Sequence, residues 1–365
     1  MKGRRLVIKI GSSLLVDCQG RLRHDWLASL AEDLAACRER GQDVIVVTSG
    51  AIALGRPLLG LKNRAPKLED QQAAAAVGQI NLAHAYQASL AAHGLSTAQL
   101  LLTLGDTESR RRYLNARSTI GSLLRLGVIP VVNENDTVAT NEIRFGDNDR
   151  LSARVAVMAS ADQLILLSDV DGLYTSDPGK DPGAVRIDLV GTITPEIEAM
   201  AGGAGSRVGT GGMISKLSAA KIATRAGCNV VLAPGSVERP LLQLEQDGPC
   251  TRFPARANPG RARKDWIAAS LGAMGVIRVD AGAAHALLRG SSLLPAGVAA
   301  VEGSFERGDP VLVQGPDGRD LAKGLSAYDA VDARAIQGHK TEAIFDVLGY
   351  RGRDELIHRD DLVLL

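Results

Sequence analysis

The chain has 365 residues, of which 45% are hydrophobic and 23% are charged, a composition typical of globular proteins that excludes a disordered or fibrous chain. Its 42 basic and 41 acidic side chains leave a net charge of +1, so no overall field would hold it on nucleic acid or an anionic membrane. Aromatic residues make up only 3%, which leaves few platforms for stacked bases, and we expect a small-molecule substrate.

The sequence carries no sign of export or of a cysteine framework. The segment MKGRRLVIKIGSS has only about five apolar residues before Gly11, too few for a signal-peptide core, and no later run reaches membrane-spanning length. This pattern predicts a cytoplasmic protein. The cysteines are spaced irregularly, without the C-x-x-C pairs of a zinc site: Cys18, Cys37, Cys228 and Cys250.

Up to about residue 250, short apolar runs alternate with helical stretches. The strand candidates are residues 6–10, 43–48, 98–103, 128–133, 163–168 and 229–233, and the clearest helical stretches are 25–40, 69–94 and 213–227. Near-continuous apolar strands separated by helices are typical of a parallel sheet covered on both faces. The first part of the chain is therefore predicted to be an α/β domain, with an open, mostly parallel sheet sandwiched by helices.

The composition and pattern of the residues change near Thr251. The segment TRFPARANPGRARK, residues 251–264, has two prolines and five basic residues but no acid, the composition of a linker between domains. From Met274 on, short apolar runs alternate with turns such as GPDG, which predicts a small β-rich domain. We expect an α/β domain over 1–252, a linker over 253–273, the β-rich domain over 274–352 and a tail over 353–365.

Unusual polar segments follow four of the predicted strands: GSS after the first, SGA after the second, NEND after the fourth and SDVDG after the fifth. In open parallel sheets, ligands bind beyond the carboxyl ends of the strands, where loops and helix amino termini converge. One such segment could be turn chemistry alone. Four of them favour a binding site at this edge of the sheet.

Lys9 interrupts the first apolar strand and is followed by Gly11, Ser12 and Ser13. A buried lysine is costly unless it is paired, so Lys9 lies at the open end of the strand or holds an anion. A lysine that protects a sheet edge from aggregation is the alternative. The glycine-serine turn that follows favours anion binding.

In TSGAIALG, Ser49 and Gly50 end the second strand and open a helix. Backbone N–H groups and the helix dipole would then point at an anionic group, a carboxylate or a phosphate. A simple helix N-cap explains Ser49 equally well.

The segments NENDTVAT and FGDNDRLSARVA bring five acidic and amide side chains together: Asn133, Asp136, Asp147, Asn148 and Asp149. The last three directly precede a predicted helix. Such groups suit an ammonium group, a nucleotide-bound magnesium ion or the orientation of lysines. Helix capping explains one or two of them but not all five. The histidines do not cluster, and the sequence shows neither a Ser-His-Asp arrangement nor a metal cage formed wholly by protein.

The segment GTGGMISK, residues 209–216, places three glycines within four residues before Lys216, but it lacks the G-K-[ST] ending of a P-loop. The segment SDVDGLYTSDP fits a nucleotide-contacting loop but is unspecific by itself. Two lysines, backbone donors and carboxylates without an obvious general base suit phosphoryl transfer to an acceptor that is already ionised, such as a carboxylate with a pKa of about 4. We therefore interpret Lys9 and Lys216 as partners of one phosphoryl group.

Five segments together resemble the glutamate 5-kinase family of the amino acid kinase superfamily: VIKIGSSLL, VIVVTSGAIALG, VVNENDTVAT, FGDNDRLSA and GTGGMISKLSAA. Residues 274–352, with GSSLLPAGV and VEGSFERGD, look like the PUA domain that many of these kinases carry. The resemblance implies phosphorylation of the side-chain carboxylate of L-glutamate by ATP with Mg²⁺. The product would be L-glutamyl 5-phosphate, in the first step of proline biosynthesis.

By position, the resemblance implies that Lys9 and Lys216 stabilise the transferring phosphoryl group and that Asp149 orients them. It assigns L-glutamate to Ser49, Asp136 and Asn148, with Asn133 and Asp147 nearby. It assigns ATP to Lys9, Ser168, Asp169, Thr210, Gly211, Gly212, Met213, Ile214, Ser215 and Lys216, and most of the magnesium coordination to the phosphates. Ser168 stands where the family usually has threonine, which keeps the hydroxyl.

The resemblance also implies a homodimer or homotetramer, feedback inhibition by proline and delivery of the product to glutamate 5-semialdehyde dehydrogenase. An RNA-binding protein is the alternative from another class, because PUA domains usually belong to RNA-modifying enzymes. The ten acidic and eight basic side chains of residues 274–352 argue against it. A kinase of another substrate, such as a nucleoside monophosphate, is the second alternative.

Overall fold

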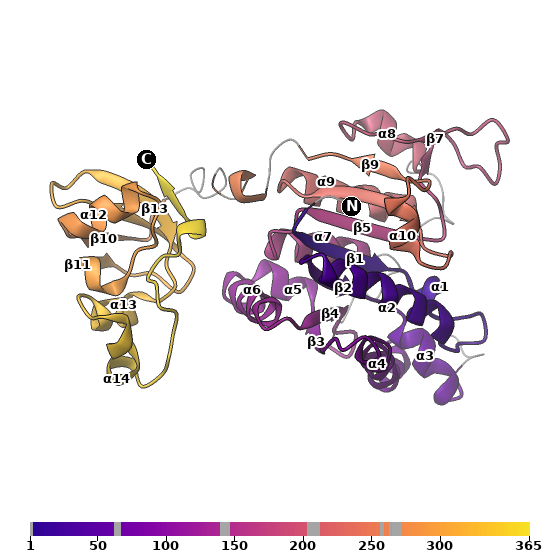
Figure 1. Cartoon of the computed structure of the whole chain (residues 1–365), viewed down its shortest axis with the longest axis horizontal. Coiled ribbons are helices and arrows are strands. Elements are labelled where there is room, and N and C mark those ends of the chain that lie inside the picture. The colour runs from indigo at the N-terminus through magenta and orange to yellow at the C-terminus, as the bar shows by residue number, and fades with distance from the viewer. Residues whose placement is uncertain are drawn as a thin grey trace. The chain divides into compact units, whose positions relative to one another are not determined.

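The computed structural model describes residues 3–61, 67–138, 147–202, 212–255, 259–262, 264 and 272–365. The chain forms two compact units, Met1–Pro259 and Gly260–Leu365 (Figure 1). Each unit has its own sheet and its own hydrophobic core. Two domains were predicted from the change in residue pattern near Thr251, and each unit is described by itself below.

The first unit is built on a seven-stranded sheet in the order β3-β4-β2-β1-β5-β8-β9. All neighbouring pairs are parallel except β8 and β9, which are antiparallel. This confirms the predicted open, mostly parallel sheet. The strands are β1 (Arg5–Ile10), β2 (Asp43–Val47), β3 (Thr97–Leu102), β4 (Ile129–Glu134), β5 (Gln163–Ser168), β8 (Asn229–Pro234) and β9 (Thr251–Phe253), and a separate hairpin is formed by β6 (Leu173–Tyr174) and β7 (Arg186–Ile187).

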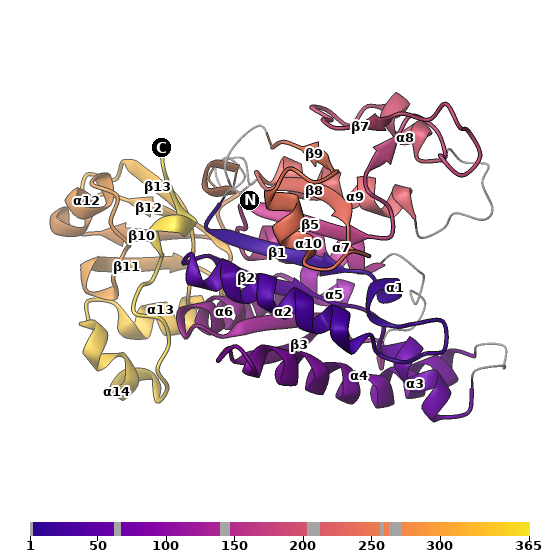
Figure 2. The same ribbon diagram turned by 45° about the vertical axis from the view of Figure 1, so that its right-hand side comes forward.

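Helices cover both faces of this sheet. Side chains of α2, α3, α4 and α10 belong to the core on one face, and those of α6, α7 and α9 belong to the core on the other. Figures 1 and 2 show α2 lying across β1 and β2, with α3 and α4 beside it. The helices are α1 (Ser12–Leu15), α2 (His24–Glu39), α3 (Ala51–Leu58), α4 (Leu68–Ala91), α5 (Leu104–Glu108), α6 (Arg110–Arg125), α7 (Asp147–Met158), α8 (Pro195–Met200), α9 (Met213–Arg225) and α10 (Pro240–Glu245).

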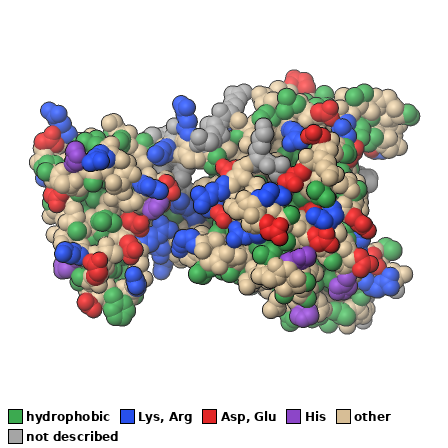
Figure 3. All heavy atoms as spheres, viewed as in Figure 1, with side chains coloured by type: hydrophobic (Ala, Val, Ile, Leu, Met, Phe, Trp, Pro, Cys, Tyr) green, Lys and Arg blue, Asp and Glu red, His purple; other side chains and the backbone are tan. Residues whose placement is uncertain are grey.

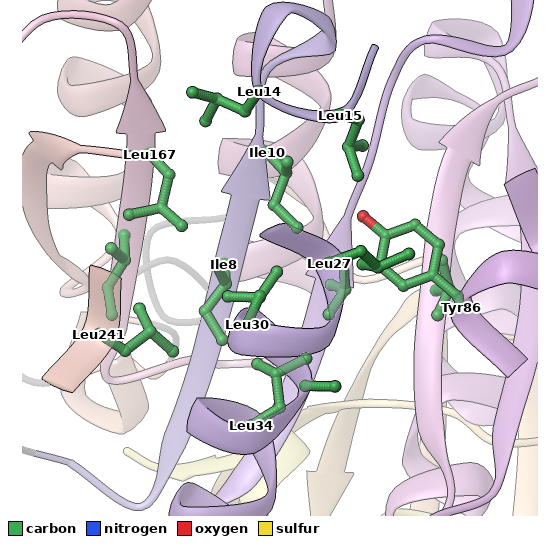
Figure 4. Packing of buried hydrophobic residues seen from close by; sticks show 14 of the residues in the cluster. Ile8, Ile10, Leu14, Leu15, Leu27, Leu30, Leu34, Tyr86, Leu167 and Leu241 are labelled. Atoms are coloured by element: carbon green, nitrogen blue, oxygen red, sulfur yellow. The ribbon is translucent and has the colours of Figure 1, made fainter. Parts of the chain in front are cut away.

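Alternation along β1 decides where Lys9 points. Leu6, Ile8 and Ile10 are buried in the core beneath α2 and α4, where Figure 4 shows Ile8 and Ile10. Val7 is buried in the core beneath α7 and α9. Successive side chains of a strand lie on opposite faces of its sheet. Lys9 therefore shares the face of Val7, under α7 and α9, at the carboxyl end of the strand.

Helices α3 and α4 approach each other through glycines. A Cβ atom on Gly78 would lie 1.8 Å from the carbonyl oxygen of Ala51, and a Cβ atom on Gly55 would lie 1.8 Å from that of Ala74. A backbone oxygen cannot move aside as a flexible side chain can. The contact matters for the site because α3 begins at Ala51, two residues after Ser49.

We expect Gly78→Ala to lower the free energy of unfolding by about 3 kcal/mol, the upper part of the usual range for overpacking. This loss would outweigh the roughly 1 kcal/mol that alanine gains over glycine in a helix. Urea denaturation of the full chain measures the effect. Gly191→Ala is the matched control, since a Cβ atom there meets nothing within 4 Å; equal midpoints for the two variants would refute the predicted clash.

The second unit contains a five-stranded sheet in the order β11-β10-β12-β13-β14, packed against short helices. This confirms the predicted β-rich domain, and GPDG forms the turn between β12 and β13. On the face shown in Figure 3, basic and acidic side chains of this unit are interspersed. Its elements are β10 (Gly275–Val279), α12 (Ala281–Leu288), β11 (Val298–Gly303), β12 (Pro310–Gln314), β13 (Asp320–Leu325), α13 (Ala330–Ile336), α14 (Ile344–Leu348), β14 (Leu362–Leu364) and the 3-10 turns Pro295–Gly297, Thr341–Ala343 and Arg359–Asp361.

Two segments have more structure than the sequence indicated. Thr251–Phe253, the start of the proposed linker composition, forms β9 at the edge of the first sheet, and the Thr251 hydroxyl donates to the carbonyl of Ile187 at 2.6 Å. Residues 353–365, set apart as a tail, supply β14 and the buried Leu356 and Ile357 to the core of the second unit. Backbone pairing over a long sequence separation produces both features, and local composition does not report it.

Within the described part of the chain, no helix is long and apolar enough to cross a membrane. All four cysteines are free thiols, with Cys18 exposed and the other three buried. Burial raises the pKa of the Cys37 thiol to about 11, which keeps it protonated and unreactive at neutral pH.

Candidate active site

The polar segments found in the sequence meet at the carboxyl edge of the first sheet. They follow β1, β2, β4 and β5, which run parallel and are neighbours in the order β4-β2-β1-β5. Lys9 on β1 is therefore central. Ser49 and Asn133 lie on one side of it along the edge, and Ser168 lies on the other.

Lys9, Asp149 and Lys216 form a buried cluster of charges. The Lys9 Nζ atom lies 2.6 Å from Oδ1 of Asp149, and the Lys216 Nζ atom lies 3.4 Å from Oδ2 of the same carboxylate. The three side chains are only 9%, 1% and 11% exposed, respectively. Two ammonium groups thus share one buried carboxylate, which leaves an excess of positive charge where an anion can bind.

The charged states in this cluster depend on one another. Burial lowers the pKa of Lys9, the Asp149 carboxylate acts to raise it again, and the Lys216 ammonium adds to the lowering. For Asp149, burial acts to raise the pKa, but Lys9, Lys216 and the hydrogen bond from Ser215 outweigh it and hold the pKa below its usual range. Asp149 is therefore ionised at neutral pH, and its charge opposes the lowering of the Lys9 pKa.

Asp149 is held by two helices whose amino ends lie at the site. It belongs to the first turn of α7, and the Ser215 hydroxyl in the first turn of α9 donates to Asp149 Oδ2 at 2.6 Å. The expectation that residues 147–149 precede the helix was wrong, because α7 begins at Asp147. Acidic side chains in a first helical turn complement the helix dipole, and the sequence pattern of a cap resembles that of a first turn.

A chain of side-chain amides lines the β4 side of the site. Asn148 Nδ2, on α7, donates to Asn133 Oδ1 at 3.4 Å, and Asn133 Nδ2, on β4, donates to Gln79 Oε1 of α4 at 2.7 Å. Asn133 is 1% exposed and Gln79 is 8% exposed. Asp136 is half-buried in the turn after β4, and the side chain of Asp147 lies outside the described residues.

Ser49 bridges the ends of β1 and β2. Its hydroxyl donates to the carbonyl of Ile10 at 2.9 Å, and Gly50 is the N-cap of α3 with a φ of 101°. This left-handed conformation suits glycine and strains other residues. The alternative that Ser49 is an ordinary N-cap is thus not what the structure shows, since Gly50 occupies that position.

On the β5 side, Ser168 ends the strand and Asp169 follows it, and the Ser168 hydroxyl donates to Asp169 Oδ1 at 2.9 Å. The loop after β8 is tied to this point: Gly235 N–H donates to the carbonyl of Ser168 at 2.6 Å, and the buried indole of Trp26 donates to the carbonyl of Gly235 at 2.6 Å. The amino end of α9 supplies Gly212 as its N-cap, followed by Met213, Ile214 and Ser215. Thr210 and Gly211 lie outside the described residues.

Two residues at the site were missed in the sequence. Gln79 is a polar residue on the buried face of an alanine-rich helix, and that mismatch between polarity and position is the signal that could have found it. Trp26 gave no comparable signal, because a tryptophan early in an amphipathic helix is ordinary core.

Comparison with known families agrees with this architecture. The model of the amino acid kinase family matches residues 4–234, which contain every site residue described above except Gly235. A second model, of the PUA domain, matches residues 275–348. The fold and the site thus define a kinase domain followed by a PUA domain.

Curated relatives show to which group of amino acid kinases the chain is similar. Glutamate 5-kinases of Paramagnetospirillum magneticum (strain ATCC 700264 / AMB-1) and Ruegeria sp. (strain TM1040) are each 59% identical to the chain over 362 residues, and that of Dinoroseobacter shibae (strain DSM 16493 / NCIMB 14021 / DFL 12) is 60% identical. Each match covers 99% of this chain and 98% of the relative. Among solved structures, UMP kinase from Ureaplasma parvum is similar over 70% of this chain and 100% of its own, with 14% identity and a TM-score of 0.49. The chain belongs to the amino acid kinase family and, within it, to the glutamate 5-kinases.

Proposed function

We propose that the chain transfers the γ-phosphoryl group of ATP to the side-chain carboxylate of L-glutamate, forming L-glutamyl 5-phosphate in the first step of proline biosynthesis. The observation that carries the proposal is the pair of buried lysines sharing Asp149, between an amide-lined side and a hydroxyl-lined side of one sheet edge. The names of the relatives support glutamate as the acceptor.

The reaction needs charge neutralisation more than acid-base chemistry. A carboxylate has a pKa of about 4, so it is ionised at neutral pH and attacks without losing a proton. A bond forms between its oxygen and the γ-phosphorus, and the bond from that phosphorus to the β,γ-bridging oxygen breaks, releasing ADP. Lys9 and Lys216 face the negative charge of the transferring group, and Asp149 holds both lysines in place.

Strand order suggests which substrate lies on which side. We assign L-glutamate to the β2–β4 side of Lys9, where a carboxylate, amides and a hydroxyl can hold its charged groups: Ser49, Asn133, Asp136, Asp147 and Asn148. We assign ATP to the β5–β8 side, where a helix amino end suits phosphate: Ser168, Asp169 and the loop from Thr210 through Lys216. Lys9 and Lys216 then contact the group that passes between the two substrates.

Magnesium enters this proposal with the nucleotide and would supply further neutralisation of the phosphates. Within the described ranges, no three acidic, histidine or cysteine side chains are placed to hold a metal ion. The groups near Lys9 are amides, hydroxyls, the Asp149 carboxylate, which two lysines already share, and the Asp169 carboxylate, which accepts from Ser168. This donor set fits an ion held largely by phosphate oxygens, with few protein ligands.

We propose a cytoplasmic location, which fits this biosynthetic role, and family resemblance supports a homo-oligomer, inhibition by proline and transfer of the product to glutamate 5-semialdehyde dehydrogenase. We also propose 1–252 as the catalytic part, 253–273 as a linker and 274–352 as the PUA domain, followed by residues 353–365. RNA binding by the PUA domain is not part of the proposal.

ADP formation by the full chain tests the acceptor. With ATP and Mg²⁺ present, we expect ADP release to depend on L-glutamate and to be far slower with aspartate, acetylglutamate, carbamate or UMP. Faster turnover with any of these alternatives would reassign the substrate.

Asn148→Ala should raise the KM for glutamate by about tenfold or more and leave the KM for ATP within about twofold, because an amide hydrogen bond to a charged group is worth about 1.5–3 kcal/mol. Ser168→Ala is the mirror variant, expected to raise the KM for ATP instead. Steady-state kinetics with each substrate varied in turn measures both. Equal changes in the two KM values for either variant would mean that the substrate sides are wrongly assigned.

A further inference from the structure

Helix α4 forms a wall behind the proposed glutamate side and turns two buried polar side chains toward it. Gln79 Oε1 accepts from Asn133 at the end of β4, and the Tyr86 hydroxyl lies 3.0 Å from Thr48 Oγ1 at the end of β2. The two residues are seven positions apart, so they share one face of the helix. Figure 4 shows Tyr86 packed within the core beneath that face.

Gln79 is the end of the chain of side-chain amides that lies farthest from the proposed substrate, followed by Asn133 and Asn148. Asn133 is almost completely buried between Gln79 and Asn148, and both partners contact its amide group. An amide has one oxygen and one nitrogen, so a partner that accepts from the nitrogen leaves the oxygen for the other neighbour. An acceptor at Gln79 thus makes Asn133 present its oxygen to Asn148.

The orientation of the Asn133 amide in turn determines the orientation of the Asn148 amide. Its nitrogen donates to Asn133, and its own Oδ1 atom is buried without a hydrogen-bond partner among the residues that the structure describes. A buried acceptor without a partner is costly. It suits a ligand that brings N–H donors, as the ammonium group of an amino acid does.

We propose that Gln79 is a positioning residue for the amino acid substrate: it sets the amide orientation of Asn133, and through it makes Asn148 present an oxygen to the substrate ammonium group. This inference rests on the proposed function, because it takes glutamate to be the ligand on the β4 side. In this proposal Gln79 does not contact the substrate and acts through Asn133.

Gln79→Met tests the inference, because methionine has a similar size but cannot accept strongly from Asn133. The KM for glutamate should rise about tenfold, the equivalent of one hydrogen bond of about 1.4 kcal/mol. Neither the KM for ATP nor kcat should change by more than about twofold. Gln87→Met is the matched control, since Gln87 is an exposed residue of the same helix.

Two further variants separate positioning from a structural role. In an Asn133→Ala background, Gln79→Met should leave the KM for glutamate unchanged, because Gln79 acts only through Asn133. Gln79→Glu keeps an acceptor facing Asn133 and should retain a lower KM for glutamate than Gln79→Met. Additive effects in the double variant, or a higher KM in Gln79→Glu than in Gln79→Met, would overturn the inference.

The outcomes also separate this inference from the proposed function. If the unaltered chain turns over glutamate and Gln79→Met leaves its KM unchanged, the positioning role fails and the kinase assignment stands. If the unaltered chain shows no glutamate-dependent turnover, the proposed function fails first. Equal increases in the KM values for glutamate and ATP would show a general structural defect and would overturn the positioning role.

Discussion

Lys9→Met and Lys216→Met are each expected to lower kcat by about 10²- to 10³-fold, the loss measured when one charge-stabilising donor is removed from a transition state. Both ammonium groups face the same buried carboxylate, and the charge that they neutralise is greatest while the phosphoryl group is in transit. Because this stabilisation belongs to the transition state, the KM values should change much less than kcat.

Lys221→Met is the matched control for these variants. Lys221 lies on the same helix as Lys216, five residues further on, but it pairs with Glu198 away from the site. Its replacement should leave kcat within about twofold. Near-normal kcat in Lys9→Met or Lys216→Met, with the protein shown to be folded by circular dichroism, would remove that lysine from the phosphoryl site.

Asp149→Asn is expected to cut kcat by at least 10²-fold, about 2.7 kcal/mol of transition-state stabilisation, and to move the alkaline limb of the kcat profile toward neutral pH. Burial already lowers the pKa of Lys9, and Asp149 is the main group that raises it again. Without that carboxylate, burial and the Lys216 ammonium both act in the lowering direction. The protonated lysine that the reaction needs would therefore be lost at a lower pH than in the unaltered enzyme.

A pH series of kcat for the two proteins measures this shift. Asp43→Asn is the control, because Asp43 forms its ion pairs with Arg5 and Arg38 at the opposite, amino end of the sheet. Breaking a buried ion pair costs about 3–5 kcal/mol, so Asp149→Asn should be studied well below its own melting temperature. An unshifted alkaline limb in the folded variant would show that Asp149 does not sustain the charge of Lys9.

Much of this fold and site could be predicted from the sequence because the signals are local. Apolar runs separated by helical stretches gave all six parallel strands to within about one residue of their observed ends, within the usual uncertainty of such boundaries. Polar segments after β1, β2, β4 and β5 indicated the site edge, since parallel strands expose their carboxyl ends together.

What the sequence did not show depends on distant partners. The sharing of Asp149 by Lys9 and Lys216 arises where α7 and α9 meet β1, and no spacing reports that distance. The orientation of an amide such as Asn133 depends on its neighbours in space, so the sequence does not predict that Gln79 orients it. Strand β9 was missed for the same reason, because it forms by pairing with β8.

The most direct test of the central claim is to trap the product. The purified full chain is incubated with ATP, Mg²⁺, L-glutamate and hydroxylamine, and the hydroxamate formed is compared with the ADP released. An acyl phosphate reacts with hydroxylamine and a phosphate ester does not, so we predict one hydroxamate for each ADP in the unaltered enzyme. In Lys216→Met, both yields should fall together. Glutamate-dependent ADP release without hydroxamate would contradict phosphoryl transfer to a carboxylate.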